Sequence, residues 1–206
     1  MALESSARIP RPLALLIVAA IVGAAGVSFF WPRGSGAPLA GMNETSSNAA
    51  PSAVGVIRRQ IDVPGSAGRI AAPAPDFEWN APDGRTLHLQ DLREKTVIVN
   101  FWATWCVPCR TELPILDAIA RDDPELIVLG VDLQEDGSAV RSFFDHYGLT
   151  AIEPLLDTDG ETFRRWGVIA LPTTFFLDHE GRIQHLARGG MTEDGIRAGL
   201  RKARGA

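Results

Sequence analysis

The sequence predicts an α/β domain with a central mixed sheet flanked by helices, and two patterns lead to that prediction. Between Phe77 and Ala203, apolar runs of strand length alternate with stretches whose apolar residues recur at helical spacing. Strands that alternate with helices are typical of layered domains with a partly parallel sheet. The only two cysteines, Cys106 and Cys109, lie where one such strand gives way to a helix.

The first half of this domain should contain a hairpin, two buried strands and a helix. The hairpin is expected from Phe77 to Leu89, with a turn at Pro82-Asp83-Gly84 between alternating apolar residues. Val97 to Trp102 is an almost continuous apolar run, which is typical of a central strand buried on both faces. A helix from about Val107 to Arg121 should follow, and then a second buried strand from Leu126 to Val131.

The second half continues the alternation of helices and strands. We expect two strands, at Thr173–Leu177 and near Arg182–Ala187, separated by a turn. Three helices are indicated by apolar residues at helical spacing: Ala139, Val140, Phe143, Phe144 and Tyr147 on the first, Phe163 and Trp166 on a short second, and Ile196, Leu200 and Ala203 on the last.

The N-terminal segment predicts a membrane anchor. Leu13 to Trp31 is a run of 19 residues without a charge. As a helix it would be roughly 28 Å long, about the thickness of the hydrocarbon core of a bilayer. Arg8 and Arg11 precede it, so the positive-inside bias places the N-terminus in the cytoplasm and the remaining chain outside. The alternative is a cleaved signal peptide with a processing site near Val22-Gly23-Ala24. Both alternatives export the domain.

The segment after the anchor reads as a flexible linker. Gly, Ala, Ser and Pro supply 25 of the 43 residues from Arg33 to Pro75. Such a composition buries too little apolar surface to offset its ordering entropy. Val54 to Val63 carries some apolar residues, so weak docking of this part on the domain is the alternative to a tether. We therefore divide the chain into residues 1–32 (cytoplasmic start and transmembrane anchor), 33–75 (linker) and 76–206 (globular domain).

Charge and cysteine content exclude two classes of function. The formal net charge is -5, and basic residues cluster only at the C-terminus, so nucleic acid is not an expected partner. Two cysteines separated by two residues cannot link distant parts of a fold as a disulfide scaffold would. The pair must therefore act locally.

The position of the pair predicts thiol chemistry. The N-terminus of a helix presents unpaired N–H groups and a partial positive charge, and both favour the thiolate of Cys106 over its thiol. Lowering a thiol pKa from about 8.5 to about 7 corresponds to roughly 2 kcal/mol. Pro108 suits the first helical turn, where its missing N–H costs nothing. Cys109, one turn further, should be more buried and should resolve the mixed disulfide that Cys106 forms.

Metal binding is the main alternative use of the pair. A structural zinc site would need two more ligands, and His179 and His185 lie 70 residues or more beyond Cys109 around a predicted turn and strand. A copper carrier using both cysteines and a histidine also remains open, although the chain has no Met-rich or His-rich tract. We expect no resident metal and no cofactor other than the redox-active cysteine pair.

Two motifs resemble those of a known superfamily. The string Phe101-Trp102-Ala103-Thr104-Trp105-Cys106-Val107-Pro108-Cys109-Arg110 resembles the active-site signature of the thioredoxin superfamily. Leu171-Pro172-Thr173 resembles its second motif. The exported anchor, the Trp-Cys-Val-Pro-Cys-Arg string and Glu112-Leu113-Pro114 are similar to the TlpA/ResA/CcmG branch of membrane-anchored thiol–disulfide oxidoreductases. The resemblance covers about Ala74 to Lys202.

The resemblance implies a thioredoxin fold with the N-terminal hairpin and with an inserted helix and strand between Asp132 and Gly160. It also implies a cis peptide bond before Pro172, beside the disulfide. Leu171, Trp102, Trp105, Val107 and Pro108 would surround the site, with Trp105 as an apolar rim and Trp102 equally suited to the core.

One position departs from the superfamily pattern. Thioredoxins carry a buried Asp where this chain has Asn100, and that acid is thought to relay a proton to the inner cysteine. Because Asn does not titrate, a relay would need water or another acid such as Glu112, or would be absent. The favoured interpretation is that Asn100 simply satisfies local hydrogen bonds.

The favoured function is an exported disulfide reductase, because the branch commonly supplies reducing equivalents for cytochrome c maturation or cytochrome oxidase assembly. Its partners would be exported disulfide-containing proteins, including apocytochrome or oxidase-assembly factors, and a membrane thiol transporter would supply electrons. A thiol peroxidase is the alternative on the same fold. It would need Thr and Pro where Ala103 and Val99 stand. The direction, reductase or oxidase, depends on the reduction potential.

Overall fold

A computed structural model describes residues 54–205, and within them eight strands form one mixed sheet in the order β3-β2-β1-β6-β5-β4-β7-β8. The parallel centre consists of β4 (Thr96–Trp102), β5 (Leu126–Leu133) and β6 (Ile152–Asp157). The strand β7 (Thr173–Leu177) pairs antiparallel with β4, and β8 (Ile183–Arg188) pairs antiparallel with β7 at the edge of the sheet. This is the thioredoxin-like arrangement of a mixed sheet with flanking helices that the sequence predicts.

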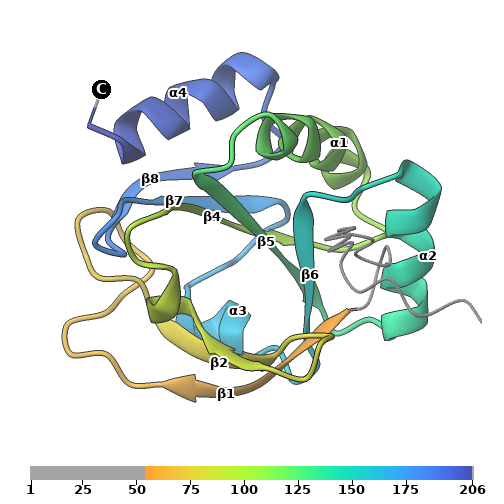
Figure 1. Ribbon diagram of the computed structural model, residues 1–206, viewed down its shortest axis with the longest axis horizontal. Coiled ribbons are helices and arrows are strands. Elements are labelled where there is room, and N and C mark those ends of the chain that lie inside the picture. Colours follow the sequence, from red (N-terminus) through yellow and green to blue (C-terminus); the bar gives the residue numbers. More distant parts are fainter. Residues whose placement is uncertain (1–53, 206) are drawn as a thin grey trace, which may run out of the picture. The chain divides into compact units, whose positions relative to one another are not determined.

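The remaining elements flank this centre. On one face lie α1 (Val107–Arg121), α2 (Gly137–Tyr147) and α4 (Glu193–Ala203), as Figure 1 shows. The other side holds the short helix α3 (Glu161–Arg165). A 3-10 turn, η1 (Leu89–Leu92), connects the N-terminal hairpin to β4.

The strand β4 is buried on both faces, as its apolar run predicts. Ile98 and Trp102 pack with α1, α2 and α4 in one core cluster, while Val97, Val99 and Phe101 pack with α3 and the N-terminal strands in another. Side chains along a strand alternate between faces, so an uninterrupted apolar run can fill two cores. The carboxyl end of β4 is thereby fixed from both sides, and the cysteine pair follows it directly.

The predicted hairpin is confirmed, with β2 (Asp76–Asn80) antiparallel to β3 (Thr86–His88). The helix and strand expected between Asp132 and Gly160 are α2 and β6. The helix α1 has the predicted bounds, and β7 matches its predicted range.

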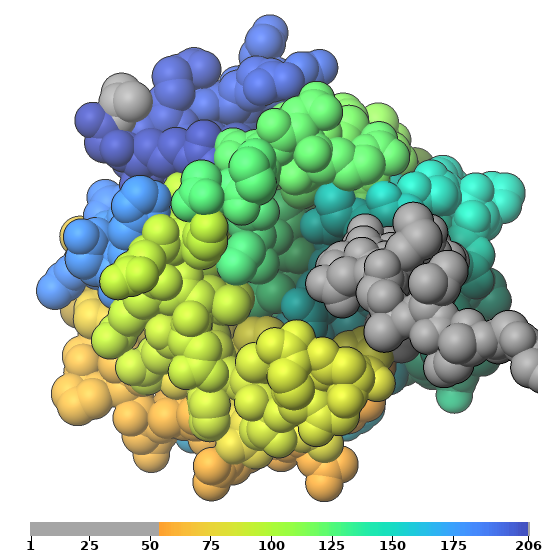
Figure 2. Space-filling view, viewed as in Figure 1, coloured from red at the N-terminus to blue at the C-terminus, as the bar shows by residue number. Residues whose placement is uncertain are grey.

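The predicted linker is wrong over its last part, because residues 55–61 already form a strand of the sheet. Residues Gly55–Ile61 form strand β1, which pairs antiparallel with β2 and parallel with β6. Ile57 is buried in the core, and this segment with the hairpin, orange and yellow in Figure 2, makes up the lower part of the face shown. The strand alternates too weakly in sequence to stand out, and its partner β6 lies about a hundred residues away.

Within residues 54–205, no helix is both long and apolar enough to cross a bilayer. The predicted anchor, Leu13 to Trp31, lies outside the described residues.

Candidate active site

The two cysteines form a disulfide at the junction of β4 and α1. The S–S distance is 2.10 Å and the Cα atoms are 5.3 Å apart. Cys106 is the residue that caps the N-terminus of α1, and Pro108 stands in its first turn as predicted. The exposed fraction is 5% for Cys106 and 0% for Cys109, so only the outer sulfur is near the surface. In the reduced protein the outer thiol is therefore the one that a partner can reach first.

The predicted cis peptide bond between Leu171 and Pro172 is confirmed. Pro172 is buried, and its carbonyl oxygen accepts a hydrogen bond of 2.8 Å from the N–H of Gly189. Leu171 is half-buried and lines the same cavity as Cys106. The second motif thus lies beside the first, as the resemblance implies.

An apolar cavity of about 640 Å³ opens beside the disulfide. Three of its lining side chains are unusually exposed for large apolar residues: Trp105 at 60%, Val107 at 71% and Ile169 at 84%. Exposed apolar side chains grouped around one cavity indicate a surface that another molecule covers. The cavity is lined by Trp105, Cys106, Val107, Pro108, Leu133, Gln134, Gly160, Phe163, Arg164, Val168, Ile169, Ala170 and Leu171.

The two flanking tryptophans have different roles. Trp102 is fully buried and packs against Phe143 and Phe144, with ring centroids 4.9 and 5.7 Å away. It is a core residue behind the site. Trp105, by contrast, lies on the exposed rim of the cavity, so the two residues share the motif but not its function.

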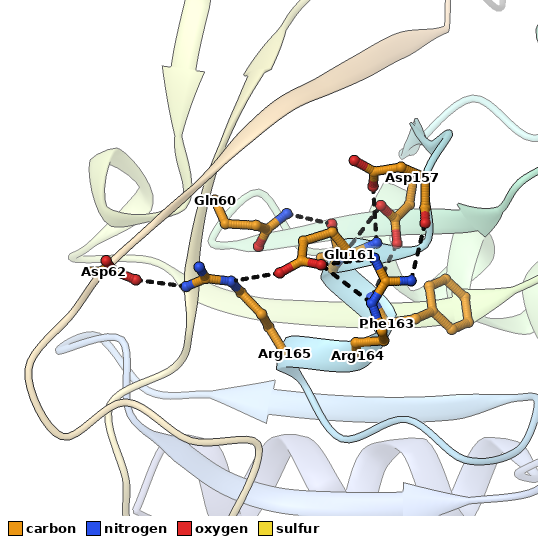
Figure 3. A network of polar contacts seen from close by, with 9 residues as sticks. Gln60, Asp62, Asp157, Glu161, Phe163, Arg164 and Arg165 are labelled. Atoms are coloured by element: carbon orange, nitrogen blue, oxygen red, sulfur yellow. Dashed lines mark hydrogen bonds and ion pairs between the residues drawn. The ribbon is translucent and has the colours of Figure 1, made fainter.

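One wall of the cavity comes from α3, which a polar network holds in place (Figure 3). The carboxylate of Asp157 accepts hydrogen bonds from the N–H groups of Thr162 and Phe163, at 3.3 and 3.0 Å. Arg165 binds Asp62, just after β1, at 2.7 Å. A helix of five residues has little stability of its own, so these bonds fix the position of Phe163 and Arg164 at the cavity.

A buried polar cluster lies behind the cysteines. Asn100 donates hydrogen bonds to Glu112 Oε1 (3.0 Å) and to Thr174 Oγ1 (2.8 Å), and the Thr174 hydroxyl donates to Glu112 Oε1 (2.9 Å). The other carboxylate oxygen, Oε2, accepts from the N–H of Met191 at 3.0 Å. Burial raises the pKa of Glu112 above its usual range, and the hydrogen bonds from Met191 and Thr174 oppose that shift.

The Nδ2 amide of Asn100 therefore satisfies local acceptors and orients a titratable acid, while its Oδ1 is buried without a hydrogen-bond partner in the protein. Glu112 follows Cys109 by three residues on α1, so the two side chains share a helix face. Both are buried, with exposed fractions of 0% and 1%.

The loop after β8 contacts all three parts of the site, and sequence reasoning missed it. Gly189 binds the carbonyl of Pro172, and Met191 binds Glu112. Gly190 lies against the first turn of α1, where an added Cβ would be 3.1 Å from Pro108 Cβ. The pair of glycines was the available signal, since adjacent glycines often permit a close backbone approach.

The histidines considered as zinc ligands lie away from the cysteines. His179 Nε2 is 3.4 Å from the hydroxyl of Thr96, at the end of β4 opposite to the disulfide. His185 lies 3.4 Å from the amine of Lys202. Among residues 54–205 no group of three or more His, Cys, Asp or Glu side chains is placed to hold a metal ion.

Comparisons with known proteins agree with this geometry. Residues 70–186, more than half of the chain, match the model of the AhpC/TSA family. The chain is 32% identical over 135 residues to the thiol-disulfide oxidoreductase ResA of Bacillus thuringiensis subsp. konkukian, covering 65% of this chain and 78% of that protein.

Solved structures show the same relationship. The exposed lipoprotein thioredoxin Etrx1 of Streptococcus pneumoniae has a TM-score of 0.55 at 30% identity, covering 62% of this chain and 98% of that one. StoA of Bacillus subtilis has a TM-score of 0.52 at 27% identity, with coverages of 63% and 98%. The chain therefore belongs to the AhpC/TSA family and is a thiol–disulfide oxidoreductase of the ResA/CcmG-like group within the thioredoxin superfamily.

Proposed function

We propose that this oxidoreductase is anchored in the cytoplasmic membrane by Leu13–Trp31 and reduces disulfides of exported proteins. The observation that carries the proposal is the Cys106–Cys109 disulfide at the start of α1, beside an exposed apolar cavity. The charge-free run behind two arginines supports export, since it has the length and the flanking charges of a membrane anchor.

The reaction transfers two electrons and two protons to the partner. The thiolate of reduced Cys106 attacks one sulfur of a partner disulfide, and a mixed disulfide forms while the first partner thiolate leaves and takes up a proton. The thiolate of Cys109 then attacks the Cys106 sulfur. The Cys106–Cys109 disulfide forms, and the second partner thiolate is released and takes up the second proton.

Glu112 is our candidate for the proton acceptor of Cys109. A buried thiol must lose its proton before it can attack, and a base with a raised pKa near neutrality serves best. Glu112 lies on the same face of α1, and burial raises its pKa. Asn100 stands at the position that is acidic in thioredoxins, and here it donates one hydrogen bond to Glu112.

We propose a protein of cytochrome c maturation or cytochrome oxidase assembly as the partner. This assignment rests on the resemblance to the TlpA/ResA/CcmG branch. The apolar rim at Trp105, Val107 and Ile169 suits a partner that presents its disulfide on an extended apolar segment. Because the chain has a single cysteine pair, a membrane thiol transporter must return the electrons.

Trapping in the native host tests the partner. The Cys109→Ser variant should accumulate mixed disulfides through Cys106, seen as larger bands on non-reducing gels that collapse on reduction. Mass spectrometry then identifies the trapped proteins, and the Cys106→Ser/Cys109→Ser variant is the control without adducts. Adducts with haem- or copper-handling assembly proteins support the proposal. Adducts spread over unrelated exported proteins contradict the cytochrome assignment and leave the thiol chemistry in place.

Export is tested separately. A reporter fused after Ala206 should be active only outside the cytoplasm, and the full-length protein should remain in the membrane fraction after an alkaline wash. Release as a shortened soluble form would instead show that Leu13–Trp31 is a cleaved signal.

A further inference from the structure

A carboxylate outside the Glu112 cluster holds the turn that carries Cys106. Glu135 follows β5, and its two carboxylate oxygens accept hydrogen bonds from Thr104, from the N–H at 2.6 Å and from the hydroxyl at 2.5 Å. The carbonyl of Thr104 accepts a third bond from Arg110 Nε at 2.7 Å. Every polar group of Thr104 is thus engaged, two residues before Cys106, and Glu135 supplies two of the three bonds.

Glu135 is itself held by a buried acid. Asp132, at the carboxyl end of β5, has an exposed fraction of 0%, and its Oδ1 accepts the backbone N–H of Glu135 at 3.0 Å. The Glu135 side chain also acts on Asp132, because it helps to raise the pKa of that carboxyl group. The other oxygen of Asp132, Oδ2, is buried without a hydrogen-bond partner in the protein. An ionised carboxylate with a free, buried oxygen is costly, whereas a protonated one can donate to its neighbour.

The surroundings of Asp132 favour that protonated form. The pKa of Asp132 rises to about 8. Burial raises it most, the side chain of Glu135 raises it next, and the charge of Asp157 on β6 raises it further. The side chain of Asp132 stands beside Trp102 of β4 and Leu156 of β6 in the sheet, neither of which carries a charge. Two carboxyl groups that lie close together share one proton far more readily than both ionise.

We propose that Asp132 and Glu135 are positioning residues that share one proton and, through Thr104, hold the Cys106 turn in its reactive arrangement. The protonated Asp132 donates to Glu135, whose carboxylate binds Thr104. When Asp132 loses its proton, two carboxylates face each other and the half-buried Glu135 turns toward solvent. Thr104 then loses two hydrogen bonds, and the turn before Cys106 loosens. The inference rests on thiol exchange at Cys106 but on no particular partner.

The Asp132–Glu135 pair and Glu112 form separate hydrogen-bond networks. The partners of Glu112 are Asn100, Thr174 and Met191, and Glu135 shares none of those hydrogen bonds. A variant of one system therefore leaves the bonds of the other in place, which makes a matched comparison possible.

The test uses full-length protein in non-ionic detergent, reduced and reacted with a peptide disulfide in a single turnover from pH 6 to 9. The rate of mixed-disulfide formation is divided by the Cys106 thiolate fraction, taken from absorbance at 240 nm. The wild-type rate per thiolate should fall about three- to tenfold around the pKa of Asp132, an effect of the size expected for the net contribution of one ordinary hydrogen bond. The Thr104 amide, followed by NMR, should move upfield over the same range.

The Asp132→Asn variant keeps an N–H donor toward Glu135 but cannot titrate. The fall in rate at alkaline pH and the shift of the Thr104 amide should therefore both disappear in it. Both changes should remain in the matched control, Glu112→Gln. The Thr104→Ala variant removes the hydroxyl that binds Glu135. Its rate of mixed-disulfide formation per thiolate should already be low at pH 6 and should not fall further at alkaline pH. An alkaline fall that persists in Asp132→Asn or in Thr104→Ala would overturn the proposal, as would a wild-type Thr104 amide that does not move. Mixed-disulfide formation by Asp132→Asn at the wild-type rate at pH 6 shows that the attack by Cys106 itself is intact.

Discussion

The side-chain amide of Asn100 donates a hydrogen bond of 3.0 Å to a carboxylate oxygen of Glu112, and each of these residues has an exposed fraction of 1%. The acid that thioredoxins carry on the strand is thus replaced by an amide that binds an acid on the helix. Glu112 is the titratable group of this cluster, and burial raises its pKa. The titratable acid of this cluster therefore lies on the helix and not on the strand, and it is buried.

Replacement of Glu112 by Gln should slow the second step of the reaction and spare the first. The amide cannot take a proton from Cys109, and general bases typically contribute about 10² to 10⁴ in rate. We expect release of the second partner thiol to slow by about 10², with unchanged formation of the mixed disulfide. Quenched-flow analysis separates the two steps. Equal slowing of both, or of neither, would contradict the role of Glu112.

Replacement of Asn100 by Asp should make the domain less stable at alkaline pH. The new carboxyl group would face Glu112 at hydrogen-bond distance, so the pKa of the pair would rise further above the unfolded values. A carboxyl group whose folded pKa is raised favours folding while protonated, and that contribution is lost as pH rises toward the folded pKa. The midpoint of thermal unfolding should match wild type near pH 5 and fall below it at pH 9. An equal difference at both pH values would indicate a packing defect instead.

Replacement of Gly190 by Ala should slow thiol exchange by displacing the first turn of α1. The added Cβ would lie 3.1 Å from Pro108 Cβ, closer than ordinary contact. We expect activity toward a peptide disulfide to fall several-fold, with a loss of about 1 kcal/mol of stability. Gly195→Ala is the matched control. Gly195 lies in α4, and its added Cβ would be 3.6 Å from Met191 Cβ, which is an ordinary contact distance. That variant should keep full activity and gain up to about 1 kcal/mol of stability. If both variants behave alike, Gly190 does not position the helix.

Replacement of Ile169 by Ser should weaken recognition of protein partners without affecting the fold. The side chain is 84% exposed at the rim of the cavity, so little of the core depends on it. Covering such a side chain contributes about 1.5–3 kcal/mol, so kcat/KM for a protein disulfide should fall about tenfold or more. Reduction of a small disulfide should be unchanged. Ile70→Ser, which changes an exposed residue outside that cavity, should have no effect on either substrate.

Local patterns in the sequence were sufficient to predict most of the domain. The run from Val97 to Trp102 and the helical spacing after Cys106 are local signals, and β4 and α1 lie where those signals predict. The strand β1 was missed because its sequence, Gly55 to Ile61, carries three consecutive polar residues within a Gly- and Pro-rich region. Its stability comes from pairing with β2 and β6, which local composition does not record.

The motifs of the site could be predicted from the sequence, but the residues that hold those motifs in place could not. Cys106, Cys109 and Pro172 stand in recognisable strings, and Glu112 could be considered because it is an acid one turn after Cys109. Glu135 contacts Thr104 across 31 residues of sequence. This contact forms because β4 and β5 are parallel neighbours in the sheet. The loops that follow these two strands therefore lie close together.

The central claim is that Cys106 attacks and Cys109 resolves, and single cysteine variants reacted with a peptide disulfide test it most directly. Mass spectrometry of samples quenched over seconds at pH 7 measures the mixed disulfide. The account predicts that Cys109→Ser accumulates a stable, stoichiometric adduct at Cys106, because the buried resolving thiol is missing. Cys106→Ser should form no adduct on this timescale, since Cys109 has an exposed fraction of 0%. Equal or faster adduct formation at Cys109 in the Cys106→Ser variant would contradict the account.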